Sequence, residues 1–236
     1  MVTTGQMVRF ARHVNALLAV LAAIGIVMTF TPTVGAQPGE ARPVRVVALG
    51  DSLTAGFGLQ PHEAFPAQLE RRLKALGHDV VIANAGVSGD TTSAGLARVD
   101  WAVPEGTDAV ILELGANDAL SGRPPHAARA NLLAIITKLK ARNIEVLLTG
   151  MRAPRNLGND YANAFDSMFP ELAAQHGLIL YPFFLTGVAL DPKLNLNDGI
   201  HPNAKGIAII AERMVPSAEE LIERVKAKRG TPRPKG

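Results

Sequence analysis

The chain contains no cysteine among its 236 residues, and only 5% of them are aromatic. The absence of cysteine excludes disulfides, thiolate catalysis and zinc sites built on cysteine. The sequence also has no internal repeat of fixed period, which excludes a repeat array. With 47% hydrophobic residues, a chain of this length is sufficient for one α/β domain with a core of its own.

Positive charge is concentrated at the two ends of the chain. Of the 24 Lys and Arg, two lie within 1–36 and six within 224–236, whereas all 21 Asp and Glu lie between these ends. The body of the chain is therefore acidic despite the net charge of +3, which argues against a nucleic-acid-binding surface. We expect 226–236 to be a solvated, disordered basic tail with at most weak contact to a membrane surface.

A long apolar run lies near the N-terminus, from Ala16 to Phe30. It follows two arginines and is succeeded by small residues that end at Ala36. This order predicts a secretory signal peptide over 1–36, cleaved after Ala36. The alternative is an uncleaved membrane anchor, but the run is short for a span that needs about 20 residues. We therefore expect a protein secreted across the inner membrane into the periplasm, with a functional domain over 37–225.

Short apolar runs alternate with helical patterns over that domain. The apolar runs predict strands at 44–49, 79–83, 109–113, 145–149 and 178–181. The spacing of apolar residues predicts helices at 64–75, 125–141, 161–176 and 203–225. Strands that are apolar on both faces and alternate with helices indicate a parallel sheet covered on both sides. Functional residues are expected just beyond the carboxyl ends of such strands.

Two candidate motifs follow the first two predicted strands. Gly50-Asp51-Ser52-Leu53-Thr54 places a serine on a strand-end turn, where its hydroxyl could serve as an exposed nucleophile. Taken alone, this serine is more readily explained as a helix N-cap. Gly89 has no side chain to block backbone approach, so its N–H is a candidate oxyanion donor, with an ordinary glycine turn as the alternative. The neighbouring Ser88, Asp90 and Thr91 are expected to be turn and cap residues.

Two further motifs follow the third strand and precede the last helix. Asn117 and Asp118 follow the strand, and an Asn amide can stabilise a developing negative charge without titrating. An ordinary Asn-Asp turn is the alternative. Asp198 and His201 lie three residues apart on a tight turn, where the carboxylate can orient the imidazole as a general base. A surface pair is the default explanation of an isolated Asp-x-x-His, yet Asp198 is a better triad acid than Asp118.

Together the motifs provide a nucleophile, a base with its orienting acid, and oxyanion donors, in the chain order Ser, Asp, His. They resemble the four sequence blocks of the SGNH (GDSL) hydrolase superfamily, and most closely its bacterial periplasmic thioesterase, lysophospholipase and arylesterase branch. The resemblance extends from Val44 to about Met214. It implies a flavodoxin-like three-layer α/β/α sandwich with a central parallel sheet, and an enzyme that needs no metal or organic cofactor.

The resemblance also implies a role for each matched residue. Ser52 would be the nucleophile, His201 the base and Asp198 its partner. The oxyanion hole would consist of the Ser52 and Gly89 N–H groups and the Asn117 side chain. Substrate-binding residues are expected beside these motifs, at Asp51, Leu114, Asp118 and Leu120.

The implied substrates are small-molecule acyl thioesters, lysophospholipids or aryl esters, cleaved through an acyl-enzyme intermediate. A carbohydrate acetyl esterase is the alternative within the same superfamily. From a different class, a non-catalytic binding module on the same fold agrees less well with an intact triad. A flavodoxin-type nucleotide binder fits worse, because the sequence lacks a glycine-rich phosphate loop with a suitable partner. No obligate protein partner is indicated.

Overall fold

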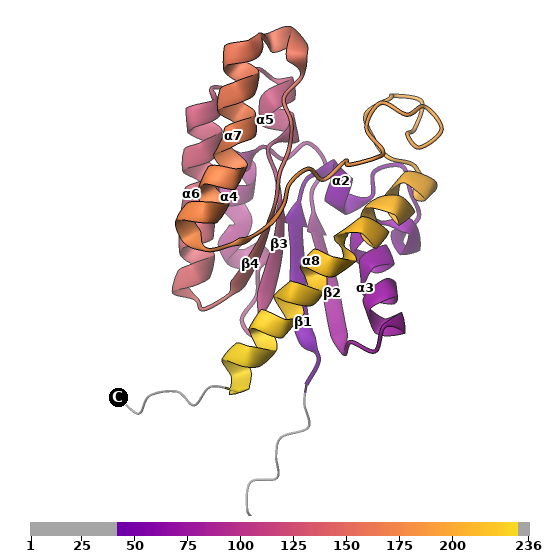
Figure 1. Cartoon of the computed structure of the whole chain (residues 1–236), viewed down its shortest axis with the longest axis vertical. Helices are drawn as coiled ribbons and strands as arrows, with labels where there is room; N and C mark the ends of the chain where they lie inside the picture. Colours follow the sequence, from indigo (N-terminus) through magenta and orange to yellow (C-terminus); the bar gives the residue numbers. More distant parts are fainter. Residues whose placement is uncertain (1–41, 231–236) are drawn as a thin grey trace, which may run out of the picture. The chain divides into compact units, whose positions relative to one another are not determined.

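A computed structural model of the chain describes residues 42–230. They form a sheet with the strand order β2-β1-β3-β4-β5, in which neighbouring strands are parallel (Figure 1). The predicted signal peptide lies outside the described residues. The strands are β1 (Val44–Gly50), β2 (Val80–Gly86), β3 (Ala109–Glu113), β4 (Glu145–Thr149) and β5 (Ile179–Tyr181).

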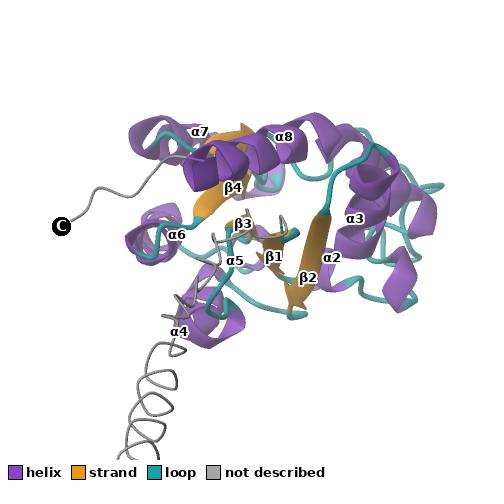
Figure 2. Ribbon diagram, turned by 90° about the horizontal axis from the view of Figure 1, so that it is seen from below, coloured by secondary structure: helices purple, strands orange, loops and turns teal. Residues whose placement is uncertain are grey.

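Helices cover both faces of the sheet, as Figure 2 shows. One face is covered by α3 (Phe65–Ala75) and α8 (Ala204–Gly230), which pack against each other. The other face is covered by α4 (Thr92–Ala102), α6 (Pro125–Ala141) and α7 (Asn159–His176). Short helices are α2 (Ser52–Ala55) and α5 (Ala116–Leu120), with 3-10 turns at Pro61–Glu63 and Arg155–Leu157. The predicted three-layer α/β/α sandwich is thus confirmed. Between residues 42 and 230, no helix is both long and apolar enough to cross a membrane.

Helix α4 is the main element that the sequence patterns do not predict. Its buried residues are Thr92, Gly95 and Arg98, together with Val99. Because polar and small residues occupy the buried face, apolar periodicity does not mark this segment as a helix. Thr91, expected to be a cap, is the N-cap of α4, and its side chain accepts a hydrogen bond from the N–H of Ala94.

Helix α8 continues past Val225, where the sequence predicted its end, to Gly230. Residues 226–230 are therefore helical and not part of the predicted disordered tail. The physical reason is that the cationic side chains of this segment form hydrogen bonds with other parts of the domain. Lys228 Nζ donates to the Asn143 carbonyl over 2.8 Å, and the Arg229 guanidinium donates to Asp108.

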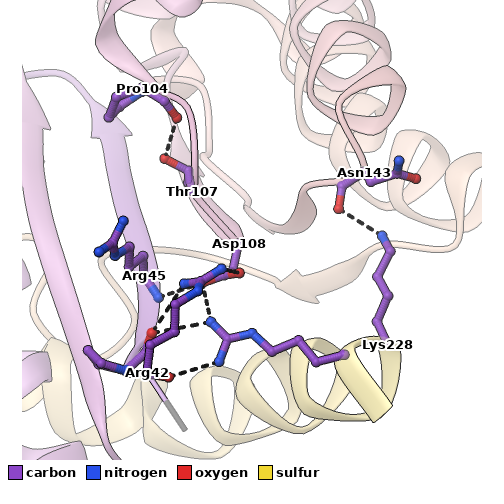
Figure 3. Close-up of polar contacts among 9 residues, drawn as sticks. Arg42, Arg45, Pro104, Thr107, Asp108, Asn143 and Lys228 are labelled. Atoms are coloured by element: carbon purple, nitrogen blue, oxygen red, sulfur yellow. Dashed lines mark hydrogen bonds and ion pairs between the residues drawn. The ribbon is translucent and has the colours of Figure 1, made fainter. Parts of the chain in front are cut away.

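Asp108 connects three segments at the amino ends of the strands, as Figure 3 shows. It accepts hydrogen bonds from the Arg42 side chain (2.7 and 2.8 Å), the Arg45 backbone N–H (2.8 Å) and Arg229 of α8. Burial acts to raise the pKa of Asp108, but these hydrogen bonds and the nearby cations outweigh burial and lower it. The last turn of α8 is thereby attached to the beginning of β1.

Glycines allow the segment after β1 to fold back closely over the carboxyl edge of the sheet. The register pairs Gly50 with both Gly86 and Glu113, so three strand ends lie side by side there. A Cβ atom on Gly86 would lie 2.2 Å from the Ala55 backbone nitrogen, and one on Gly50 would lie 2.1 Å from Thr54 Oγ1. Only glycine fits these two positions, and α2 is therefore seated directly on the strand ends.

Candidate active site

A serine, a histidine and an aspartate form a continuous hydrogen-bonded chain beyond the strand ends. Ser52, the first residue of α2, places its Oγ 2.9 Å from His201 Nε2. His201 Nδ1 lies 2.7 Å from Asp198 Oδ2. With its proton on Nδ1 donated to the carboxylate, the imidazole can accept the serine proton at Nε2. The structure thus brings together the three residues that the sequence predicted as a triad.

Asp198 is held in place by its own turn. Its Oδ1 accepts the backbone N–H groups of Ile200 and His201, each over 3.0 Å. These bonds, together with the bond from the His201 side chain, lower the pKa of Asp198 to about 2. Gly199 has a φ of 76°, a left-handed conformation that the turn requires and that glycine adopts without strain. The carboxylate is therefore ionised and fixed against the imidazole.

The ring of Phe57 packs against the imidazole ring of His201. Phe57 was not among the predicted site residues. Its ring centroid lies 4.5 Å from that of the imidazole, and the two planes are tilted by 33°. Gly56, with a φ of 84°, ends α2 and turns the chain so that Phe57 reaches the histidine. No motif in the sequence marks this contact, because it depends on how α2 ends.

The predicted oxyanion donors lie on neighbouring segments. Asn117 Nδ2 donates to the Asp90 carbonyl over 2.9 Å and to Asp51 Oδ2 over 3.2 Å. Asn117 therefore lies against the loop that contains Gly89 and against the residue that precedes Ser52. Gly89 has a φ of 88° and open space where a Cβ would be, so its loop presents backbone without a covering side chain.

A cavity of about 160 Å³ adjoins Ser52 and His201. Leu120, which the sequence predicted to bind substrate, forms part of its wall. The apolar residues of the wall are Leu53, Ala116, Ala119, Leu120, Met151, Pro154, Leu185, Ala189, Leu190 and Ile200. Because this wall is mainly apolar, the cavity suits a hydrocarbon group attached to a reacting centre at the serine.

The other predicted substrate-binding residues do not lie on the cavity wall. Asp51 is fully buried beneath the α2 turn, and Leu114 is 1% exposed in the core against Gly95. Asp118 accepts hydrogen bonds from the Thr92 backbone N–H and hydroxyl, both over 2.7 Å. Asp118 thus links α5 to the start of α4 and so positions its neighbour Asn117, which does line the cavity.

Part of the wall comes from segments that carry no recognisable motif. Met151, Arg152 and Pro154 follow β4, and Leu190 lies in the long segment before α8. The Arg152 guanidinium carbon lies 4.8 Å from the Phe183 ring centroid. Only the topology could indicate these residues, because β4 lies next to β3 and ends at the same edge of the sheet.

A parallel α/β sandwich with a Ser-His-Asp chain at the carboxyl edge of its sheet defines a serine hydrolase of the α/β type. Residues 48–209 match the model of the GDSL-like Lipase/Acylhydrolase family. The chain belongs to this family, the SGNH (GDSL) hydrolases, as its motifs predicted.

The relatives and solved structures that resemble the chain agree with this assignment. The chain is 35% identical to an arylesterase of Vibrio mimicus over 201 residues, which cover 85% of this chain and 97% of that protein. It is 36% identical to thioesterase 1/protease 1/lysophospholipase L1 of Escherichia coli (strain K12), over 75% of this chain and 84% of that protein. The crystal structure of TesA has a TM-score of 0.71 and 36% identity, covering 75% of this chain and 99% of that chain. The chain is therefore a carboxylic ester hydrolase of the SGNH type.

Proposed function

We propose that the protein hydrolyses carboxylic esters and thioesters with Ser52 as nucleophile, His201 as base and Asp198 as the orienting acid. Ser52 Oγ attacks the acyl carbon while its proton passes to His201 Nε2. The carbonyl oxygen becomes an oxyanion, which accepts hydrogen bonds from the N–H groups of Ser52 and Gly89 and from Asn117 Nδ2. Both hydrogens of this amide have acceptors before attack, so the one in the longer bond, 3.2 Å to Asp51, is then shared with the oxyanion.

The intermediate then collapses to an acyl-enzyme. The bond from the acyl carbon to the leaving oxygen or sulfur breaks, and the imidazolium returns its proton to that atom. Water repeats the sequence: His201 takes a proton from it, the hydroxide adds to the acyl carbon, and Ser52 leaves with the proton restored. Every step uses groups of this chain and water.

The observation that carries this proposal is the short hydrogen-bonded chain from Ser52 Oγ through His201 to Asp198, with distances of 2.9 and 2.7 Å, at the edge of an apolar cavity. A nucleophile within hydrogen-bond reach of a base that a third group orients is the geometry that acyl transfer requires. The names of the relatives, an arylesterase and a thioesterase/lysophospholipase among them, support the same substrate classes.

The cavity favours acyl chains longer than acetyl. A void of about 150 Å³ is enough to hold a benzene molecule, and this cavity of about 160 Å³ is similar in size. An acetyl group would leave most of the apolar wall exposed to water, whereas several methylenes would cover it. This favours an acyl-lipid or aryl-ester substrate over the acetylated sugar of the alternative.

The test is the hydrolysis of p-nitrophenyl esters from acetyl to palmitoyl by the wild-type protein and by Ser52→Ala. We expect the wild type to be most active on an ester whose acyl chain is longer than acetyl. We expect the folded Ser52→Ala variant to lose this activity. Because residual catalysis from the oxyanion hole and binding survives loss of a triad member, the variant's rate is compared with the uncatalysed rate. Full activity in Ser52→Ala would refute the assignment, and an acetyl optimum would favour the acetyl esterase.

We further propose that the protein acts in the periplasm after removal of residues 1–36. The support is the sequence order of positive charge, apolar run and small residues. N-terminal sequencing of protein from the periplasmic fraction should begin at Gln37. Recovery of the chain in the membrane fraction with its N-terminus intact would indicate an uncleaved anchor instead.

A further inference from the structure

A glutamate lies at the end of the otherwise apolar strand β3, directly beneath the α2 turn. Glu113 is 0% exposed. Its Oε2 accepts hydrogen bonds from Thr54 Oγ1 over 2.8 Å and from the Asp51 backbone N–H over 3.3 Å. Its Oε1 is buried and receives no hydrogen bond from residues 42–230. A buried carboxylate oxygen without a donor is costly, whereas the same oxygen carrying a proton is itself a donor.

The neighbouring acceptor is the side chain of Asp51, which is also 0% exposed. The two carboxyl groups are neighbours, since Glu113 Oε2 also accepts the backbone N–H of Asp51, so a proton on Glu113 can be donated to the Asp51 carboxylate. Asp51 Oδ1 accepts the Leu53 N–H over 2.9 Å, and Oδ2 accepts Asn117 Nδ2 at 3.2 Å. Asp51 therefore joins the turn that carries Ser52 to the amide that we assign to the oxyanion hole.

No cation in the described part of the chain is bonded to either carboxyl group. Arg98, which packs under the same turn from α4, is bonded to Asp90 Oδ2 over 2.6 Å and to the Gly50 carbonyl over 2.9 Å. Charge on His201, in the segment before α8, acts to lower the pKa of Asp51, and the like charge of Asp90 acts to raise it. Two adjacent buried carboxylates without a cation would repel each other, so one of them must hold a proton.

The surroundings of the two carboxyl groups indicate which of them holds the proton. Both oxygens of Asp51 accept hydrogen bonds, whereas Glu113 Oε1 accepts none from the described residues. Burial raises the pKa of Glu113 far above its ordinary value, and the charge of Asp51 raises it further. Burial also raises the pKa of Asp51, to about 6, but the bond from Leu53 opposes that increase. The proton is therefore assigned to Glu113, with Asp51 as the adjacent acceptor.

We propose that Glu113 is a positioning residue: a neutral carboxylic acid that donates its proton to Asp51, which in turn holds the Ser52 turn and the Asn117 amide in register. This inference rests on the proposed function, since it concerns the geometry of that reaction. Ionisation or removal of Glu113 would leave the Asp51 carboxylate with the bonds from Leu53 and Asn117 alone. The common support of the serine and its oxyanion donor would then be weakened, although among residues 42–230 no hydrogen bond joins either of them to Glu113.

Two substitutions of Glu113 test whether the wild-type side chain acts as a neutral acid or as a charged carboxylate. In Glu113→Gln the amide can donate to Asp51 and accept from Thr54, so we expect kcat to stay within about threefold of the wild type. In Glu113→Leu both bonds are lost, and a small displacement of the reacting groups should lower kcat by about 10- to 100-fold with KM nearly unchanged. Glu145→Leu, at the start of β4, is the matched control and should leave kcat unaltered.

The kinetic outcomes are decisive if both variants give the wild-type circular dichroism spectrum. Equal loss in Glu113→Gln and Glu113→Leu would mean that the charge of an ionised Glu113 matters, and would overturn the proposal. Full kcat in Glu113→Leu would overturn it as well, because no positioning role would remain.

Two measurements do not depend on hydrolysis, so they test Glu113 even if the proposed function fails. Infrared spectroscopy near neutral pH should show the carbonyl stretch of a protonated carboxylic acid, and Glu113→Gln should remove it. Since the pKa of Glu113 is raised on folding, its contribution to stability is complete below its unfolded value of about 4.3 and is lost as the pH rises through the folded value. The melting temperature of Glu113→Gln minus that of the wild type should therefore increase with pH. A missing band or a constant difference would contradict a neutral acid.

Discussion

Asp198 Oδ2 lies 2.7 Å from His201 Nδ1, while the other oxygen of the same carboxylate accepts two backbone N–H groups of its turn. An amide in place of the carboxylate can present an N–H to Nδ1 and so favour the wrong tautomer. We expect Asp198→Asn to reduce kcat by about 10³- to 10⁴-fold, measured with p-nitrophenyl butyrate. Asp191→Asn, on the same segment, should leave kcat unchanged; a comparable loss there would point to general disturbance of the segment.

Acid stability should respond to the same carboxylate. Folding lowers the pKa of Asp198 to about 2, so its contribution is present above the unfolded value of about 3.9 and is lost as the pH falls through the folded value. The stability difference between the wild type and Asp198→Asn, followed by urea unfolding, should therefore shrink between about pH 4 and pH 2. A difference that grows on acidification would show that Asp198 is not the ionised partner of His201.

Asn117 is expected to act on the transition state more than on substrate binding. Asn117→Ala should lower kcat by about 10²- to 10³-fold with little change in KM, because the oxyanion forms only after attack. The control is Asn131→Ala, which removes an amide bonded to Thr92 Oγ1 and does not alter the cavity wall. Near-normal turnover in a folded Asn117→Ala protein would rule out the oxyanion role.

The sequence predicted the sheet and the triad because their signals are local. The strands are short apolar runs between breakers, and Asp198 and His201 lie on one turn, so their pairing requires no knowledge of the fold. Ser52 lies 149 positions from His201, yet both were placed at strand or helix ends, where a parallel sheet collects functional residues.

The parts that were missed depend on long-range packing. Phe57 reaches His201 through the left-handed end of α2, and Leu190 reaches the cavity from a segment without regular structure. Asp118 resembles a site residue in sequence, but it bonds to Thr92. Glu113 did leave a signal, since a charged residue at the end of an otherwise apolar strand needs an explanation. The sequence alone could not supply its partner, Asp51.

Leu190 should affect both the stability of the protein and its preference for acyl-chain length. It lies on the cavity wall, is 90% exposed and has a φ of 64°, in the left-handed region that leucine rarely adopts. Leu190→Gly relieves the strain, whereas Leu190→Ala keeps it, so the glycine variant should be more stable by about 1 kcal/mol in urea unfolding. Equal stability of the two variants would mean that the backbone is not strained at this position.

Both Leu190 variants remove the apolar end of the leucine side chain, beyond its Cβ atom, from the cavity wall. We expect kcat/KM for p-nitrophenyl octanoate to fall by about three- to tenfold in each, because fewer methylenes of the acyl chain are shielded from water. The value for the acetyl ester should not change, since that group is too short to reach along the wall. A uniform loss on both esters would instead indicate a disturbance near Ser52.

The attachment of α8 to β1 should contribute measurably to stability. Asp108 accepts charged hydrogen bonds from Arg42 and Arg229 and a backbone bond from Arg45, and Asp108→Asn weakens all three. We expect a loss of about 2 kcal/mol in the free energy of unfolding near neutral pH. Asp100→Asn, which breaks only an exposed pair with Lys138, should cost less than about 1 kcal/mol.

The pH dependence distinguishes an ionic attachment from simple packing. Folding lowers the pKa of Asp108, so its contribution is present above the unfolded value of about 3.9 and disappears as the pH falls below it. The wild type and Asp108→Asn should therefore converge in stability on acidification. A chain that ends at Val225 lacks Lys228 and Arg229 and should lose stability by the same mechanism, so Asp108→Asn should have a smaller effect in it. Asp108→Asn could instead lower the free energy of unfolding by the same amount in the shortened chain and in the full one. That result would show that the cations of α8 do not contribute to the stabilising effect of Asp108.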